Sequence, residues 1–300
     1  MNSKKMNNAD LRGKLPILIL SMVPPVFIRF PGFRLWIALV ICFPLSLHLS
    51  AQSTDTLVLL QTLPVSATFA TTDNLGNLYI LTPDNALEKY NAEGRRLARY
   101  SNNRLGAATS IDAANPLKLL VWYADFRTAV FLDRSLTELG ALSLDAAGFT
   151  IVRSVAMSFD GNLWAYDEAL FKLKKITPEG MVLFETPALN QLVAAPPTAD
   201  ELKEIGNQVY LADRQQGIFI FDQYAAWLAT WPDLPGRDFY ALDGRQYTLT
   251  EQGLRIRTTR PLADIHILLP GAVDENSHFR LTEQRLLIWD ARQLRVYRLP

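Results

Sequence analysis

Residues 154–184 read SVAMSFDGNLWAYDEALFKLKKITPEGMVLF, and this stretch decides the fold. It divides into four short segments, 154–159, 162–166, 170–176 and 181–184, in which apolar and polar residues tend to alternate. A period of two is typical of a β-strand, because successive side chains point to opposite faces of a sheet. The sequences between the segments contain Asp-Gly and Pro-Glu-Gly, and glycine supplies the positive φ that tight hairpins need. The stretch therefore predicts one sheet of four antiparallel strands.

The same unit recurs along the chain at intervals of 37 to 46 residues. The second strand of each unit is centred on a large residue, and these are Tyr79, Trp122, Trp164, Tyr210, Tyr247 and Leu287. A period near 40 residues with several short strands per repeat is the signature of a β-propeller. Residues 52–300 hold about six repeats, so the sequence predicts a six-bladed β-propeller with four antiparallel strands per blade. The one predicted exception is a short helix or turn over 198–204, which has a capping-box-like start after two prolines.

The two ends of the repeat array predict how the ring closes. The last repeat, 277–300, supplies only three strands, and a spare strand over 55–63 precedes the first repeat. An unpaired sheet edge favours aggregation, so the strand at 55–63 is predicted to pair with the strand at 293–299 as the outer strand of blade six. The other five blades are predicted near 66–100, 109–144, 153–186, 203–231 and 238–269.

The first 51 residues are predicted to be a secretory signal peptide. Arg29 and Arg34 precede an apolar run over 35–47, and Ala51 offers a small residue for cleavage. The run is shorter than the roughly 20 residues of a membrane span, although a permanent anchor stays a possible alternative. A lipid anchor on Cys42 is a second alternative. We therefore expect two parts, a signal peptide over 1–51 and a propeller over 52–300, with an exported, periplasmic or secreted location and no stable membrane span after cleavage.

Composition and charge exclude several classes of protein. Hydrophobic residues make up 49% of the chain and charged residues 20%, which is a globular balance rather than a disordered one. The 30 basic residues equal the 30 acidic ones in number, so no basic field indicates a nucleic-acid partner. The single cysteine lies in the predicted signal peptide, which leaves the propeller without a possible disulfide or thiolate metal site.

The repeats resemble those of a known group of propellers. Gly76-Asn-Leu-Tyr79, followed by Leu87-Glu-Lys-Tyr-Asn-Ala-Glu-Gly94, is similar to the NHL-type six-bladed propellers and to the wider group of gluconolactonase-like and quinoprotein-like propellers. The resemblance covers about 55–300 and is specific for architecture, because this fold carries many functions. Gluconolactonase-like propellers hold a divalent metal at the channel mouth through carboxylate and amide oxygens. The candidate metal ligands that this implies are Asn103, Glu201, Glu204 and Asp238, with Ca²⁺ as the natural ion.

Loops on a rigid scaffold usually carry binding, and the longest loops here are the connections between blades. Several cationic residues lie in or beside these connections or at the exits of the second strands, where they would suit an acidic ligand. These candidates are Arg104, Arg127, Arg153, Arg214, Arg237 and His278. The sequence thus favours an exported binding or scaffold module of the cell envelope, with an envelope protein, a peptide or a glycan as its partner and no cofactor. The alternative is a metal-dependent, lactonase-like hydrolase with a site at the channel mouth.

Four aspartates end the second strands of their repeats, namely Asp125, Asp167, Asp213 and Asp290. Aspartate often caps a hairpin by accepting backbone N–H groups, and this is their predicted role. The alternative is a ring of carboxylates that holds a cation or a basic partner. No glycine-rich phosphate loop and no nucleophile motif occurs in the sequence.

Overall fold

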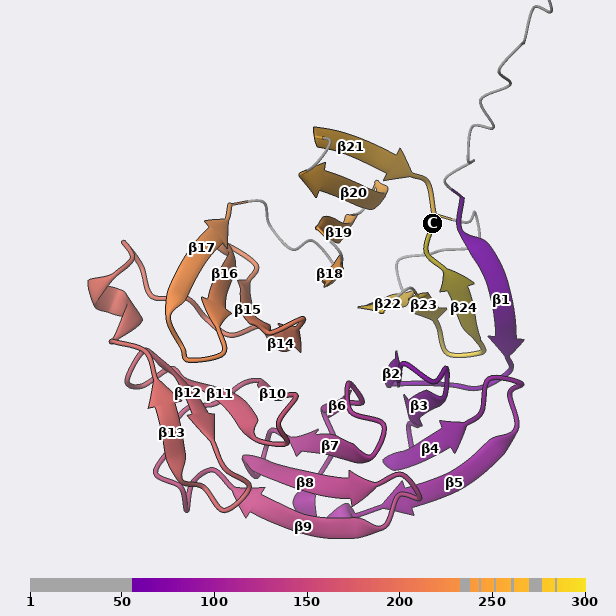
Figure 1. Ribbon diagram of the computed structural model, residues 1–300. Helices are drawn as coiled ribbons and strands as arrows, with labels where there is room; N and C mark the ends of the chain where they lie inside the picture. Colours follow the sequence, from indigo (N-terminus) through magenta and orange to yellow (C-terminus); the bar gives the residue numbers. More distant parts are fainter. Residues whose placement is uncertain are drawn as a thin grey trace, which may run out of the picture. The chain divides into compact units, whose positions relative to one another are not determined.

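The computed structural model describes residues 56–232, 238–242, 244–250, 252–259, 262–269, 277–283 and 285–300. In these residues 24 strands form six four-stranded antiparallel sheets, arranged as blades around a central channel (Figure 1). The predicted six-bladed β-propeller is confirmed. Two short 3₁₀ segments, η1 (Asn103–Leu105) and η2 (Leu189–Gln191), lie in the connections between blades. No helix in the described part is long and apolar enough to cross a membrane.

Each of the first three blades runs outward from the channel in chain order. Blade 1 consists of β2 (Phe69–Thr72), β3 (Leu78–Leu81), β4 (Ala86–Tyr90) and β5 (Arg96–Ser101). Blade 2 consists of β6 (Ser110–Asp112), β7 (Lys118–Tyr123), β8 (Thr128–Asp133) and β9 (Glu138–Ser143). Blade 3 consists of β10 (Val155–Met157), β11 (Leu163–Asp167), β12 (Lys172–Ile176) and β13 (Val182–Glu185).

Blades 4 and 5 follow the same plan. Blade 4 consists of β14 (Glu201–Ile205), β15 (Gln208–Asp213), β16 (Gly217–Asp222) and β17 (Trp227–Trp231). Blade 5 consists of β18 (Asp238–Leu242), β19 (Arg245–Thr250), β20 (Gly253–Thr259) and β21 (Leu262–Ile267).

Blade 6 joins the two ends of the propeller. Its inner three strands are β22 (His278–Thr282), β23 (Arg285–Trp289) and β24 (Leu294–Arg298), and its outer strand is β1 (Val58–Leu63). The indigo β1 lies beside the yellow β24 in Figure 1. The pair is antiparallel, with Thr62 opposite Arg295 and Leu63 opposite Leu294. The predicted closure of the ring is therefore confirmed.

Buried side chains fill the seams between neighbouring blades. Alternate residues of the second strands face opposite seams: Leu163 and Ala165 pack towards blade 2, whereas Trp164 and Tyr166 pack towards blade 4. The tryptophans also make polar contacts across a seam, since Trp122 Nε1 donates to the carbonyl of Arg153 at 3.0 Å. The large residues that define the sequence repeat thus hold neighbouring blades together.

The predicted short helix or turn over 198–204 is wrong, because most of this segment belongs to the inner strand β14. β14 pairs with β15 over five residues, and burial of Leu202 within blade 4 outweighs the local capping pattern. Thr198 does not start a helix. Its backbone N–H instead donates to Asp213 Oδ2 at 2.8 Å. Blade 4 therefore begins at Glu201 rather than near residue 203.

The aspartates that end the second strands fall into different groups. Asp213 and Asp290 cap their hairpins as predicted, since each accepts two N–H groups from the following turn. Asp167 instead lies buried and pairs with Lys174 at 3.0 Å. Asp213 and Asp290 thus act as hairpin caps, whereas Asp167 belongs to a buried ion pair.

Candidate functional site

The two ends of the central channel differ in what surrounds them. One end lies on the face where the connections between blades enter the inner strands, and we call it the connection face. The other lies where the inner strand of each blade turns back into the second strand, and we call it the turn face. β6 illustrates the geometry: Thr109 precedes it on the connection face, and Ala114 follows it on the turn face.

A cavity of about 740 Å³ opens on the connection face. This volume is within the range of ordinary ligand sites. The lining comes from the beginnings of inner strands of all six blades and from the strands beside them. Its polar and aromatic members include Thr68, Phe69, Thr109, Ser110, Asp112, Arg153, Ser154, Asp200, Glu201, Arg214, Asp238, Ser277, His278, Arg280 and Trp289.

A second cavity of about 800 Å³ opens on the turn face. The two cavities share Ile111, Asp112 and Arg280 in their linings. They are therefore the two mouths of one channel, and these three residues mark its waist. Arg280 can be reached from the channel because its side chain keeps 20% of its surface exposed.

Charged side chains from blades 4, 5 and 6 meet at the waist. Lys203 Nζ lies 2.6 Å from Asp238 Oδ1 and 3.2 Å from Glu201 Oε1, and it donates to the carbonyl of Phe239 at 2.7 Å. Arg280 donates through Nη1 to Glu201. Asp238 also accepts the N–H of Leu281 in blade 6. Buried charges persist when they are paired and hydrogen-bonded, so this network ties three blades together around the channel.

The two carboxylates of the waist have pKa values moved in opposite directions. Burial, followed by the nearby Glu201 carboxylate, raises the pKa of Asp238 to about 6. Burial also opposes ionisation of Glu201, but Arg280 and Lys203 outweigh it and lower the pKa of Glu201 to about 2. Burial raises the pKa of Asp112 as well. Burial thus makes Asp238 and Asp112 easier to protonate, whereas the neighbouring cations keep Glu201 ionised.

The raised pKa of Asp238 predicts that stability falls as pH rises from about 4 to 7. In this range the folded protein binds more protons at Asp238 than the unfolded chain does, whose pKa is near 3.8. The loss is on the order of 2–3 kcal/mol. Glu201 acts in the opposite sense, but only below about pH 4.5. Chemical unfolding at several pH values checks this: Asp238→Asn should flatten the decline, and an equally steep decline in that variant would contradict it.

An aromatic wall stands on the blade 6 side of the connection-face cavity. The exposed His278 ring stacks on Trp289, with centroids 5.7 Å apart and planes 23° apart. Phe69 of blade 1 meets Trp289 edge-on at 6.4 Å, and the Arg280 guanidinium lies 5.2 Å from the centroid of Phe69. Trp289 is 3% exposed, and in the described part of the chain its Nε1–H has no hydrogen-bond acceptor. A buried donor without a partner costs about 1–3 kcal/mol of stability.

The structure brings together some of the predicted ligand-binding residues and separates others. Arg153, Arg214 and His278 line the connection-face cavity. The Arg153 guanidinium is bound to Glu168 at 2.9 Å, and that of Arg127 is bound to the two carboxylate oxygens of Asp145 outside the cavity. Arg104 lies on η1, also outside the lining. Arg237 lies outside the described residues.

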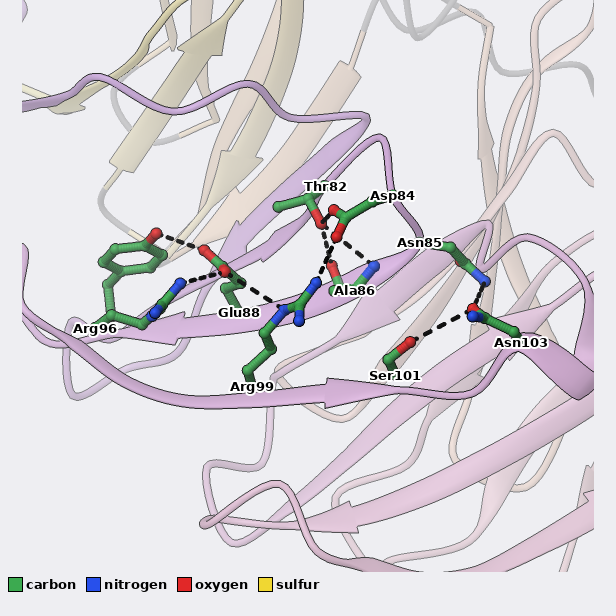
Figure 2. Close-up of polar contacts among 10 residues, drawn as sticks. Thr82, Asp84, Asn85, Ala86, Glu88, Arg96, Arg99, Ser101 and Asn103 are labelled. Carbon is green, nitrogen blue, oxygen red and sulfur yellow. Dashed lines mark hydrogen bonds and ion pairs between the residues drawn. The ribbon is translucent and has the colours of Figure 1, made fainter.

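Of the four predicted metal ligands, the structure brings Glu201 and Asp238 together and places Glu204 and Asn103 elsewhere. Glu201 and Asp238 lie at the waist and are paired with cations, while Glu204 lies at the turn face, where it binds Trp164 Nε1 and the N–H of Phe159. This follows from β14, which carries Glu204 to the far end of a strand. Figure 2 shows Asn103 near Asn85 and Ser101 of blade 1. In the described part of the chain no group of three His, Cys, Asp or Glu residues could hold a metal ion.

Four important side chains of this site were not predicted from the sequence: Phe69, Lys203, Arg280 and Trp289. Arg280 and Glu201 are 79 residues apart, and Lys203 and Asp238 are 35 apart. These four residues share one sequence signal. Each is a charged or large aromatic residue on an inner strand or on the strand next to it, where small or aliphatic residues are more usual. That signal identifies the residues but not their partners.

Comparisons with known proteins support the fold. No protein-family model and no curated protein sequence matches the chain. The WD40 domain of Neurospora crassa Pan2 has a TM-score of 0.55 at 11% identity, covering 82% of this chain and 96% of that domain. An inactive variant of virginiamycin B lyase from Staphylococcus aureus, solved with quinupristin, has a TM-score of 0.52 at 12% identity, covering 77% and 80%. These likenesses are to β-propellers in general, so the resemblance to the NHL type stays a prediction.

Proposed function

We propose that this protein is an exported binding module that holds its ligand in the connection-face cavity. The observation that carries the proposal is that cavity itself: about 740 Å³, built from all six blades, with charged, hydroxyl and aromatic side chains converging on one mouth. The basic and apolar residues of 29–51 support export. Propellers commonly bind through one mouth of the channel because the ring holds the loops rigidly.

The waist makes this mouth a pre-formed site. The pairs Arg280–Glu201 and Lys203–Asp238 fix the floor of the cavity, and a fixed floor means that a ligand loses little binding energy to reordering of the protein. Charged, hydroxyl and aromatic side chains converge on this mouth from all six blades. Such a lining supports binding as the function of the cavity.

A thermal-shift panel on the purified propeller tests this proposal. The panel contains neutral oligosaccharides, an acidic peptide, a basic peptide and Ca²⁺, since a ligand that binds only the folded form raises the melting temperature. Two cysteine variants locate the site, because residues 52–300 contain no cysteine. Thr109→Cys and Ala114→Cys lie at opposite ends of β6, on the connection face and the turn face. A bulky maleimide should abolish the shift at position 109 and spare it at position 114.

The opposite pattern would place the site on the turn face and contradict the proposal. A shift caused by Ca²⁺ alone, and removed by a chelator, would favour the metal-dependent hydrolase instead. A panel in which no class of ligand produces a shift would also count against the proposal, because the cavity should take at least one of these chemistries.

A further inference from the structure

The charges around the connection-face cavity are largely neutralised within the protein. The Arg153 guanidinium is bound to Glu168, that of Arg280 to Glu201, and Lys203 to Asp238. The lining holds three arginines against four carboxylates, from Asp112, Asp200, Glu201 and Asp238. Such a balanced set of charges attracts neither strongly acidic nor strongly basic ligands from a distance. A neutral polar ligand therefore fits this cavity better than the acidic ligand that the arginines alone suggest.

The aromatic wall offers a flat surface for one face of such a ligand. His278 is exposed and is supported from behind by Trp289, at a centroid distance of 5.7 Å. Trp289 is fixed by its burial in the seam between blades 6 and 1. The C–H groups on one face of a sugar ring make weak favourable contacts with an aromatic face. An exposed ring on a rigid support is therefore suited to stacking against a pyranose.

Hydrogen-bonding groups surround the wall. Hydroxyl side chains enter the lining from four inner strands or the residues just before them, and these are Thr68, Thr109, Ser110, Ser154 and Ser277. Arg280 uses Nη1 for Glu201 and its Nε is fully buried, but its side chain keeps 20% of its surface exposed to the channel.

The exposed part of the Arg280 guanidinium can donate to a hydroxyl oxygen of a sugar, because every nitrogen of the group carries N–H donors. We infer that the connection-face cavity binds a neutral saccharide, with one pyranose ring stacked on His278 and its hydroxyl groups bonded by Arg280 and the hydroxyl rim. This inference rests on the proposed function and names the class of ligand for that same site. It does not require catalysis.

Calorimetric titration of the purified propeller with three neutral probes tests the inference: chitotetraose, cellotetraose and maltotetraose. We expect at least one of them to bind. His278→Ala should weaken that binding about five- to tenfold, because the stacking face is lost, and His278→Phe should restore most of it. His266→Ala is the matched control, since His266 is exposed on the outer strand β21 beside Asp264. Melting temperatures of all three variants show whether each one is folded.

The outcomes separate this inference from the proposed function. Binding of an acidic or basic peptide at the connection face without saccharide binding would overturn the inference and leave the proposed function intact. Saccharide binding that His278→Ala leaves unchanged would overturn the stacking arrangement. No binding of any neutral probe would also overturn the inference. Loss in His278→Ala, recovery in His278→Phe and no change in His266→Ala would support it.

Discussion

Deleting residues 53–63 is expected to lower the melting temperature by about 15 °C or more, or to abolish cooperative unfolding. The deletion removes β1, which supplies the outer strand of blade 6 and pairs with β24 from Val58 to Leu63. It leaves the edge of β24 unpaired and takes Leu63, which is 5% exposed, from the core between blades 6 and 1. An open ring also exposes an edge for aggregation. Differential scanning calorimetry of the purified propeller measures the effect.

Two point variants of β1 show whether the lower stability comes from opening the ring or only from shortening the chain. Leu63→Asp places a charge in a buried position and should destabilise the propeller by about 3–5 kcal/mol. Leu59→Asp is the control, because Leu59 is 52% exposed, and its effect should stay within about 0.5 kcal/mol. If the deletion and Leu63→Asp both melt like the unmodified protein, β1 does not close the ring.

Lys203→Ala should be the most damaging single change at the waist of the channel. It leaves the buried carboxylates of Asp238 and Glu201 with Arg280 as their remaining cation. Removing one partner of a buried ion pair costs about 3–5 kcal/mol, because the other charge stays buried without compensation. For a domain of this size each kcal/mol corresponds to about 2–4 °C in melting temperature, so we expect a fall of at least about 6 °C.

A double variant and a surface control test whether the loss of stability comes from the unpaired buried charge. Adding Asp238→Asn to Lys203→Ala should recover part of the lost stability, because the uncompensated charge is removed, and the coupling appears in a double-mutant cycle. Lys172→Ala breaks an exposed pair with Glu185 and should cost less than about 1 kcal/mol. A Lys203→Ala protein that melts like Lys172→Ala would show that the waist network contributes little.

The architecture was predictable because its signals are local and repeated. Trp122 and Trp164 mark the centres of second strands, and each turn residue acts within a few positions of its hairpin. Gly94 and Gly180, for example, take φ values of 81° and 92°, as tight turns require. The closure by β1 was predictable by a different route, since three strands in the last repeat left one to be supplied from the other end of the chain.

The site was predictable only in part, because its contacts join residues that are far apart in the sequence. Arg153, Arg214 and His278 line the connection-face cavity, as expected from their positions in or beside the connections and the second-strand exits. The pairing of Arg280 with Glu201 depends on how the strands of blades 4 and 6 are positioned across the channel, which no local pattern shows. The prediction of a short helix or turn over 198–204 was wrong because a capping pattern is a local preference, whereas each blade needs an inner strand to line the channel. Burial of that strand decided the outcome.

Hydrogen exchange with and without bound ligand, read by mass spectrometry, tests the central claim most directly. The probe is whichever ligand gives the largest thermal shift. If the ligand occupies the connection-face cavity, exchange should slow in the peptides that contain Thr109, Ser154 and His278, which line that mouth. The peptides of the turn face that contain Asn74, Asn115 and Gly206 should be unchanged. Slower exchange at the turn face with no change around Ser154 and His278 would contradict the account.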